Sequence, residues 1–199
     1  MLTSSALPPT TDLPVLRQQL LQLLATKAYA EGDFILSSGQ QSSYYINGKF
    51  VTLSGEGSFA VGHLLFAQLP EDTDAVAGLT LGADPLVTAV TVVSAYQGCP
   101  LSGFIVRKQA KGHGTKAYIE GPEMTVGANV VVLEDVVTTG KSAMEAVNRL
   151  RDASYQVKQI IALVDRKQGG AEFYQSQNID FQSLFTIEDI QEAYRQLSL

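Results

Sequence analysis

Short apolar runs alternate with helix-forming segments through most of the chain. The four runs that predict buried strands are Ala75–Leu79, Ser102–Val106, Val130–Leu133 and Ile160–Val164. Helices are predicted at Pro85–Tyr96 and from Gly140 to about Ala153. Apolar strands that alternate with helices indicate a parallel sheet covered on both faces. The predicted fold is therefore α/β, a parallel twisted sheet flanked by helices.

The N-terminal part follows a different pattern. Asp12 is a candidate helix cap before Pro14, and leucines at helical spacing predict a helix through about Ala30: Leu16, Leu20, Leu23 and Leu24. The segment Tyr44-Tyr45-Ile46 predicts a strand, and Gly57–Leu69 predicts a second helix. We therefore expect a single domain with an N-terminal helix and hood segment, residues 1–50, and a core, residues 51–199.

Composition and charge narrow the function classes. The 199 residues are 45% hydrophobic and 17% charged, which allows a core and excludes a disordered chain. The net charge of −6 disfavours nucleic-acid binding. The N-terminus lacks a secretory signal pattern and no apolar run is long enough for a membrane span, so a cytoplasmic location is expected. Cys99 is the only cysteine and is expected to be a buried, unreactive thiol.

The stretch after the third predicted strand carries the clearest chemistry. Glu134 and Asp135 follow the strand, and a Thr/Gly turn then leads into a helix. Backbone N–H groups at such a turn and at a helix N-terminus suit a phosphate, and Gly140 permits close approach of the backbone. Three hydroxyl side chains add donors: Thr138, Thr139 and Ser142. Ligands of parallel sheets bind at this end of the strands.

A nucleotide triphosphate fits this stretch poorly. Gly140-Lys141-Ser142 resembles the end of a Walker A loop, but that motif requires Gly where Asp135 stands. Two carboxylates repel a triphosphate, whereas they accept hydrogen bonds from ribose hydroxyls. The prediction is a phosphorylated ribose held by residues 134–142, the acids on the 2- and 3-hydroxyls and the turn on the 5-phosphate. These residues are Glu134, Asp135, Val136, Val137, Thr138, Thr139, Gly140, Lys141 and Ser142. The alternative is an ordinary strand–turn–helix connection.

A second group of residues predicts a pyrophosphate site. Basic side chains follow the strand Ser102–Val106 in an otherwise acidic chain: Arg107, Lys108, Lys111, His113 and Lys116. With Gly112 and Gly114 they favour a lid that closes over pyrophosphate, although a solvated basic loop is the simpler alternative. Backbone amides of Leu81–Asp84 could also hold pyrophosphate, unless this turn is only a helix cap. His63, in an apolar helix, is expected to be structural.

These segments together carry a family resemblance. Residues 130–142 resemble the phosphoribosyl-pyrophosphate signature of type I phosphoribosyltransferases. With Arg107-Lys108-x-x-Lys111-x-His113-Gly114, the chain looks like a member of the orotate phosphoribosyltransferase family. Further matches, in order along the chain, are Phe34-x-Leu36-x-Ser38-Gly39 with Ser42-x-Tyr44, Gly82-Ala83-Asp84-Pro85, and Val164-Asp165-Arg166 with Gly169-Gly170.

The resemblance implies a type I phosphoribosyltransferase fold with a small N-terminal hood, and a specific reaction. Family members join phosphoribosyl pyrophosphate to orotate with Mg²⁺, held mainly through the substrate, giving orotidine 5′-monophosphate and pyrophosphate in UMP synthesis. It implies a homodimer whose basic loops reach into neighbouring sites, with Lys108, Lys111, His113 and Asp135 as catalytic residues. Thr138 and Arg166 are implied to contact orotate, whose carboxylate an Arg can bind bidentately.

Three alternatives and one departure from the family pattern stay open. Arg166 could instead form a surface ion pair. The acceptor could be another base, such as a purine, although a purine offers no carboxylate to Arg166. A non-catalytic regulator that senses phosphoribosyl pyrophosphate would need a nucleic-acid-binding face, which the net charge of −6 does not favour. Many family members have Lys where this chain has Ser37, and Lys49 or another cation could compensate.

Overall fold

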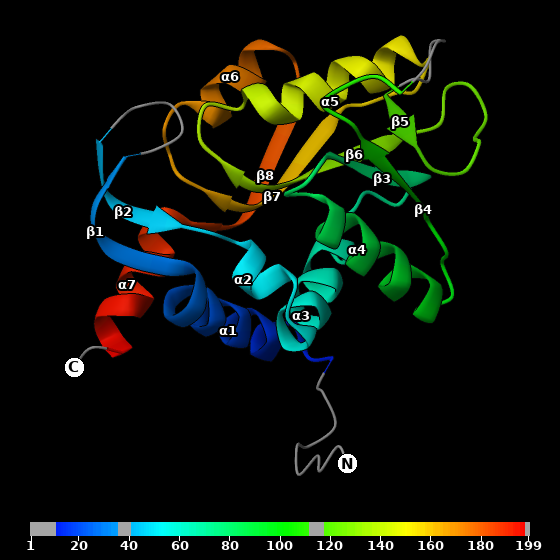
Figure 1. Ribbon diagram of the computed structural model, residues 1–199. Coiled ribbons are helices and arrows are strands. Elements are labelled where there is room, and N and C mark those ends of the chain that lie inside the picture. The colour runs from blue at the N-terminus through cyan, green and yellow to red at the C-terminus, as the bar shows by residue number, and fades with distance from the viewer. Residues whose placement is uncertain (1–10, 36–40, 112–117, 198–199) are drawn as a thin grey trace.

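The computed structural model describes residues 11–35, 41–111 and 118–197. Its centre is a six-stranded sheet in the order β5-β4-β3-β6-β7-β8 (Figure 1). The strands are β3 Ala75–Leu79, β4 Ser102–Val106, β5 Ile119–Glu120, β6 Val130–Val137, β7 Gln159–Asp165 and β8 Asp180–Thr186. All neighbouring strands pair in parallel except β5, which is antiparallel to β4. The predicted α/β fold with a parallel sheet is confirmed.

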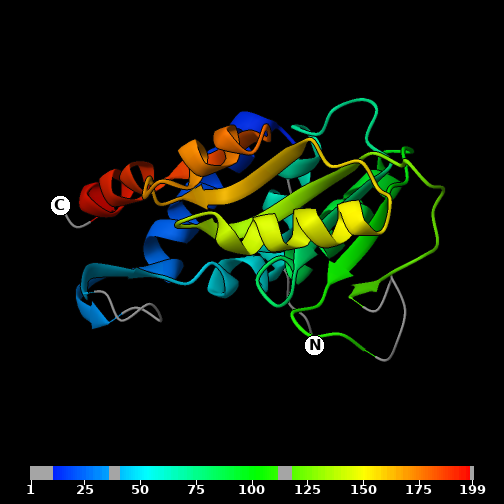
Figure 2. The ribbon, with the colours of Figure 1, turned by 90° about the horizontal axis from the view of Figure 1, so that it is seen from above.

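Helices cover both faces of the sheet (Figures 1 and 2). One layer consists of α5 Lys141–Asp152 and α6 Gly170–Ser176. The opposite layer contains α1 Leu13–Leu23, α3 Gly55–Phe66, α4 Asp84–Tyr96 and α7 Ile187–Leu197. Along β6, Val130 and Val132 pack toward the α5 layer, while Val131 and Leu133 pack toward the other. This alternation is why an apolar strand fills two cores at once.

The N-terminal part forms a helix and a two-stranded hairpin. The carboxylate of Asp12 caps α1 by accepting a hydrogen bond from the backbone N–H of Val15 at 3.1 Å, as the sequence predicted. The helix predicted through about Ala30 ends slightly earlier, because α1 passes into a π-helical turn, Leu24–Ala28, and Tyr29 already begins a strand. The chain then enters β1 Tyr29–Ile35, which pairs in antiparallel fashion with β2 Gln41–Ile46.

Two further predictions need correction. The strand predicted to stop at Leu133 continues to Val137, because β7 pairs with this last part and supplies backbone partners.

Cys99 is exposed rather than buried. It lies in the short surface connection between α4 and β4, where backbone polar groups need water and apolar cover is lacking.

Close packing of two helices positions Lys49, which lies near Asp135. The short helix α2, Lys49–Thr52, runs directly against the start of α3. A Cβ atom at Gly57 would lie 2.1 Å from the backbone oxygen of Val51, so only glycine allows this approach. His63, further along α3, is buried beside Phe59, consistent with its predicted structural role.

Adding one methyl group should test this packing. We expect Gly57→Ala to lower the free energy of unfolding by about 1–3 kcal/mol, because the α2–α3 contact must open. Gly55→Ala, in the same helix with no atom within 4 Å of the added Cβ, should be neutral or slightly stabilising. Urea unfolding at one protein concentration measures both variants. Equal stability of the two would contradict the assigned contact.

Candidate active site

The Thr/Gly turn predicted to bind phosphate, residues 138–142, lies where β6 meets α5. It is called the phosphate-type turn. Gly140 has a left-handed backbone, with φ of 81°, and begins α5 with no side-chain cap. A small cavity of about 80 Å³ lies here, lined by the predicted residues from Val136 to Ser142 together with Glu134 and Tyr174. A Cβ at Gly140 would lie 2.8 Å from the Tyr174 ring. The positive end of a helix thus lies against one small cavity that the turn residues line.

Glu134 is buried on the wall of this cavity. Its Oε2 atom has no hydrogen-bond partner within the described ranges, and the same holds for the buried hydroxyl of Tyr174. Burial raises the pKa of Glu134 well above its ordinary value, and the neighbouring charge of Asp135 raises it further. Burial, with the charges of Glu134 and Asp165, also raises the pKa of Tyr174. The cavity wall therefore holds a carboxyl group whose pKa is raised by burial and by a neighbouring acid.

Asp135 lies in different surroundings from Glu134. Its Oδ2 atom is 4.0 Å from the Nζ atom of Lys49 in α2, and its Oδ1 atom accepts a hydrogen bond from the Val136 N–H at 2.9 Å. A Cβ at Gly82 would lie 2.5 Å from Oδ1, so the loop after β3 packs directly on this carboxylate. Asp135 thus acts on the neighbouring Glu134 and also contacts Lys49 and the loop after β3. The joint contact of the two acids with ribose hydroxyls stays a prediction.

The loop between β3 and α4 borders the same edge of the sheet. The hydroxyl of Thr80 donates a hydrogen bond to Oδ2 of Asp84 at 2.8 Å. The Oδ1 atom of Asp84 is buried without a hydrogen-bond partner in the described part of the chain. The predicted segment Leu81–Asp84 is therefore next to the acidic pair. Within residues 11–35, 41–111 and 118–197, no group of three or more His, Cys, Asp or Glu is arranged to hold a metal ion.

The segment that follows β4 carries Arg107, Lys108 and Lys111 and is called the basic loop. Arg107 donates to the carboxylate of Glu120 at 3.0 Å, and the Lys111 ammonium lies 3.5 Å from the same oxygen. These two cations lower the pKa of Glu120, with the Arg107 hydrogen bond as the larger cause. The charge of Lys108 acts on Glu134 and opposes the rise of its pKa. The predicted residues His113 and Lys116, like Ser37 and Ser38-Gly39 of the N-terminal motif, lie outside the described residues.

Arg149 of α5 holds the base of this loop. Its guanidinium donates to the backbone oxygens of Arg107 and Lys108, the second at 3.1 Å, and pairs with Glu145. It also lies 4.1 Å from the ring centroid of Tyr118, on the returning part of the loop. One side chain therefore contacts both ends of the basic loop from the helix that starts at the phosphate-type turn.

Arg166 is buried at the end of β7, with 8% of its surface exposed. Its backbone N–H donates to the Val137 oxygen at 2.9 Å, which places it beside the turn that contains Thr138. Its Nε atom donates to the hydroxyl of Tyr44 at 3.0 Å, and Nη2 is buried without a partner in the described ranges. A surface ion pair, the simpler alternative for Arg166, is therefore wrong.

Comparison with known proteins identifies the family. No protein-family model matches the chain. An orotate phosphoribosyltransferase from Synechocystis sp. is 67% identical over 195 residues, 98% of each chain. Crystal structures of orotate phosphoribosyltransferase from Mycobacterium tuberculosis H37Rv are also similar. The complex with Fe(III) dicitrate has a TM-score of 0.77 and 37% identity over 88% of this chain and 98% of the other. The complex with phosphoribosyl pyrophosphate has a TM-score of 0.72 and 33% identity, covering 88% and 99%.

The chain belongs to the orotate phosphoribosyltransferase family. The family resemblance drawn from the motifs and the type I phosphoribosyltransferase fold are thereby confirmed, and so is the assignment as an enzyme. None of the helices in the described part of the chain has the length and apolar content needed to cross a bilayer.

Sequence reasoning missed several residues that shape the site of this family member. Glu120 pairs with the basic loop, Tyr174 lies under the phosphate-type turn, and Arg149 holds the loop base. Tyr44 entered the sequence motif without a role, yet it contacts Arg166. Alternation along β2 gave one signal, since it predicts that Tyr44 and Tyr45 face opposite sides. The others had no local signal, because their partners are distant in sequence.

The buried state of Glu134 predicts a pH dependence of stability. A raised pKa in the folded state means that folding takes up a proton, so stability falls as pH rises above the ordinary value of 4.5. In Glu134→Gln this loss should be absent, so the stability of the variant relative to the parent should rise as the pH increases above 4.5.

Urea unfolding at several pH values measures this difference. Glu123→Gln, which removes an exposed carboxylate, provides the control and should keep the parent's pH profile. Identical pH profiles for the parent and Glu134→Gln would show that Glu134 is not the group responsible.

Proposed function

We propose that the chain transfers the 5-phosphoribosyl group from phosphoribosyl pyrophosphate to orotate in UMP synthesis. The products are orotidine 5′-monophosphate and pyrophosphate. One observation carries the proposal: the phosphate-type turn after β6 and the buried Arg166 after β7 are adjacent, joined by the hydrogen bond from Arg166 N–H to Val137. A turn suited to phosphate and a buried cation whose Nη2 atom has no partner in the described ranges suit the two ends of this reaction.

The turn supplies the site for the 5-phosphate. Backbone N–H groups from Thr138 to Ser142, the side-chain hydroxyls and the start of α5 act together on an anion. Asp135 is placed to accept hydrogen bonds from ribose hydroxyls and to stabilise positive charge at C1 as the bond to pyrophosphate breaks. Glu134, buried on the cavity wall, is the second acid for the ribose hydroxyls in this proposal.

The basic loop and the loop after β3 serve the leaving group. Lys108, Lys111 and His113 neutralise charge on pyrophosphate as it departs, with Arg107 in support. Arg107 and Lys108 line a cavity of about 420 Å³ together with Thr80, so both loops border one space. Because Arg107 and Lys111 pair with an exposed Glu120, exchanging that partner for pyrophosphate costs little. No covalent nucleophile is needed, and positioning supplies much of the rate.

The residues present fit a magnesium ion held mainly through substrate oxygens. Asp84 and Asp135 border the loop after β3, and one oxygen of Asp84 is buried without a partner in the described ranges. Oxygen donors of this kind suit Mg²⁺, which keeps several waters and binds through few carboxylates. When bound, the ion would neutralise pyrophosphate charge, while the protein's cations orient the leaving group.

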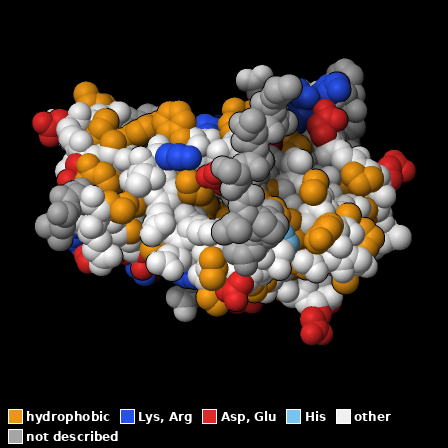
Figure 3. All heavy atoms as spheres, turned by 90° about the horizontal axis from the view of Figure 1, so that it is seen from below, with side chains coloured by type: hydrophobic (Ala, Val, Ile, Leu, Met, Phe, Trp, Pro, Cys, Tyr) orange, Lys and Arg blue, Asp and Glu red, His pale blue; other side chains and the backbone are white. Residues whose placement is uncertain are grey.

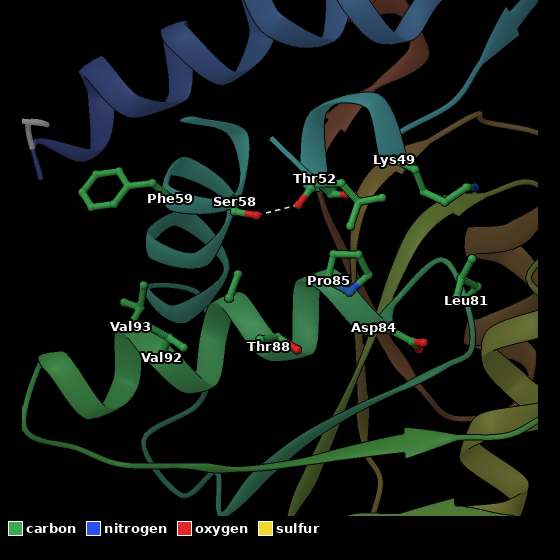
Figure 4. A pocket seen from close by; sticks show the side chains of 12 residues that line it. Lys49, Thr52, Ser58, Phe59, Leu81, Asp84, Pro85, Thr88, Val92 and Val93 are labelled. Carbon is green, nitrogen blue, oxygen red and sulfur yellow. Dashed lines mark hydrogen bonds between the residues drawn. The ribbon is translucent and has the colours of Figure 1, made fainter. Parts of the chain in front are cut away.

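The enzyme acts as a homodimer in this proposal. An apolar cavity of about 560 Å³ lies between α3 and α4, beside Lys49 and Asp84 (Figure 4). Three large apolar side chains around it are mostly exposed: Leu53, Leu81 and Val92. Hydrophobic side chains are spread over this helical side of the molecule (Figure 3). Such a face next to the site suits a second copy, whose basic loop would complete the site.

The remaining parts of the proposal concern organisation and base choice. In this proposal residues 1–50 are the N-terminal helix and hood segment and residues 51–199 are the core, and β2 of the first segment contacts Arg166. Arg166 and Thr138 bind orotate, and a purine would leave the Arg166 side chain without its carboxylate partner. The cytoplasmic location expected from the sequence stays a prediction.

Base choice provides the direct test. Purified protein with Mg²⁺ and phosphoribosyl pyrophosphate should release pyrophosphate with orotate but not with adenine, guanine or hypoxanthine. Arg166→Gln should raise the KM for orotate about 10- to 100-fold, because a charge-assisted hydrogen bond is lost. Arg166→Lys keeps the charge and should recover part of the loss. Turnover with a purine, or an unchanged orotate KM in Arg166→Gln, would contradict the base assignment.

The role of Asp135 can be measured separately. Asp135→Asn removes the negative charge next to Lys49 and so removes the charged acceptor proposed for the ribose hydroxyls. Binding of phosphoribosyl pyrophosphate should weaken about 10-fold or more. Titration calorimetry with Mg²⁺ present measures the affinity. Asp152→Asn, which changes an exposed acid at the far end of α5, is the matched control and should bind normally. Unchanged affinity in Asp135→Asn would rule out the ribose contact.

A further inference from the structure

One buried contact joins the N-terminal hairpin to the end of β7. The Nε atom of Arg166 donates a hydrogen bond to the Tyr44 hydroxyl at 3.0 Å, and the guanidinium carbon lies 4.7 Å from the Tyr44 ring centroid. Tyr44 is 9% exposed and Arg166 8% exposed, so water competes little for this pair. A ring on the guanidinium face and a bond to Nε together restrict the rotation of the side chain.

The contact leaves the other part of the guanidinium available. Nη2 of Arg166 is buried and has no hydrogen-bond partner in the described ranges. A buried donor without a partner is costly, and a ligand acceptor placed there removes that cost. Because Tyr44 occupies Nε, an incoming carboxylate must meet the terminal nitrogens of Arg166 rather than its Nε side.

We infer that Tyr44 is a positioning residue that makes the enzyme select a base with a carboxylate, by holding Arg166 with its terminal nitrogens toward the base. The inference rests on the proposed function, since it assumes that Arg166 binds orotate. Tyr44 acts through Arg166 and touches no reacting atom in this scheme.

The hydroxyl of Tyr44 can be removed without disturbing its ring. Tyr44 stacks on Tyr29 with ring centroids 5.8 Å apart, and Tyr29 packs edge-on against Tyr194 of α7 at 5.1 Å. Tyr44→Phe should therefore keep its place. Tyr29→Phe is the matched control, because the Tyr29 hydroxyl bonds to Glu31 and Gln191 and not to Arg166.

Steady-state kinetics of the full-length enzyme with Mg²⁺ test the inference. The KM values for orotate and for phosphoribosyl pyrophosphate are measured, together with the inhibition constant of uracil, which lacks the carboxylate. Tyr44→Phe should raise the orotate KM about five- to thirty-fold, since Arg166 loses its orientation. The KM for phosphoribosyl pyrophosphate and the uracil inhibition constant should stay near the parent values. Tyr29→Phe should match the parent throughout.

A double mutant separates positioning from general packing. In the Arg166→Gln background, Tyr44→Phe should cause little further change in orotate KM, because the group through which Tyr44 acts is gone. A full additional loss there would overturn the inference. The inference also fails if Tyr44→Phe weakens uracil binding as much as orotate binding, or if it behaves like Tyr29→Phe.

These outcomes also separate the inference from the proposed function. If orotate fails to release pyrophosphate with the parent enzyme, the proposed function itself is wrong. If the parent uses orotate, Arg166→Gln impairs it and Tyr44→Phe does not, only the role of Tyr44 is wrong.

Discussion

The parallel pairing of β6 between β3 and β7 is the constraint on which the rest of the structure depends. Its apolar residues pack into both helical layers, so the strand cannot shift by one residue without burying the wrong side chains. The same pairing carries the strand through Glu134 and Asp135 to Val137. The acidic pair is therefore held by sheet hydrogen bonds, and the phosphate-type turn begins from a rigid base. A site on regular structure of this kind is more accurately positioned than one on a free loop.

Local electrostatics then decide what this edge can bind in an acidic protein. Burial raises the pKa of Glu134, which makes its charged form more costly beside a turn suited to phosphate. Cations come from other elements: Lys49 faces Asp135, and Lys108 acts on Glu134. Arg107 and Lys111 are paired with exposed Glu120, an arrangement that keeps the basic loop charged yet weakly held. The positive groups thus surround the edge without a permanent strong partner.

Two arginines connect distant parts of the chain to this edge. Arg149 runs from α5 to the base of the basic loop, so the helix that begins at the phosphate-type turn also supports the loop proposed to bind pyrophosphate. Arg166 runs from β7 to Tyr44, which joins the N-terminal hairpin to the end of the sheet where the base is proposed to bind. In both cases a planar guanidinium with several fixed donors links backbone or hydroxyl groups that a lysine could not hold together.

The sequence by itself predicted the strands β3, β4, β6 and β7, apart from the last part of β6, and the Asp12 cap; it also suggested the chemistry proposed for residues 134–142. These features are readable because each is a contiguous pattern governed by local periodicity and local hydrogen bonding. Only tertiary structure decided three further features: the polar strand β8, the deeper burial of Glu134 than of Asp135, and the exposure of Cys99. The same holds for the Arg149 and Arg166 contacts, which span 42 and 122 residues. Such contacts depend on how the layers stack, and no local pattern encodes that arrangement.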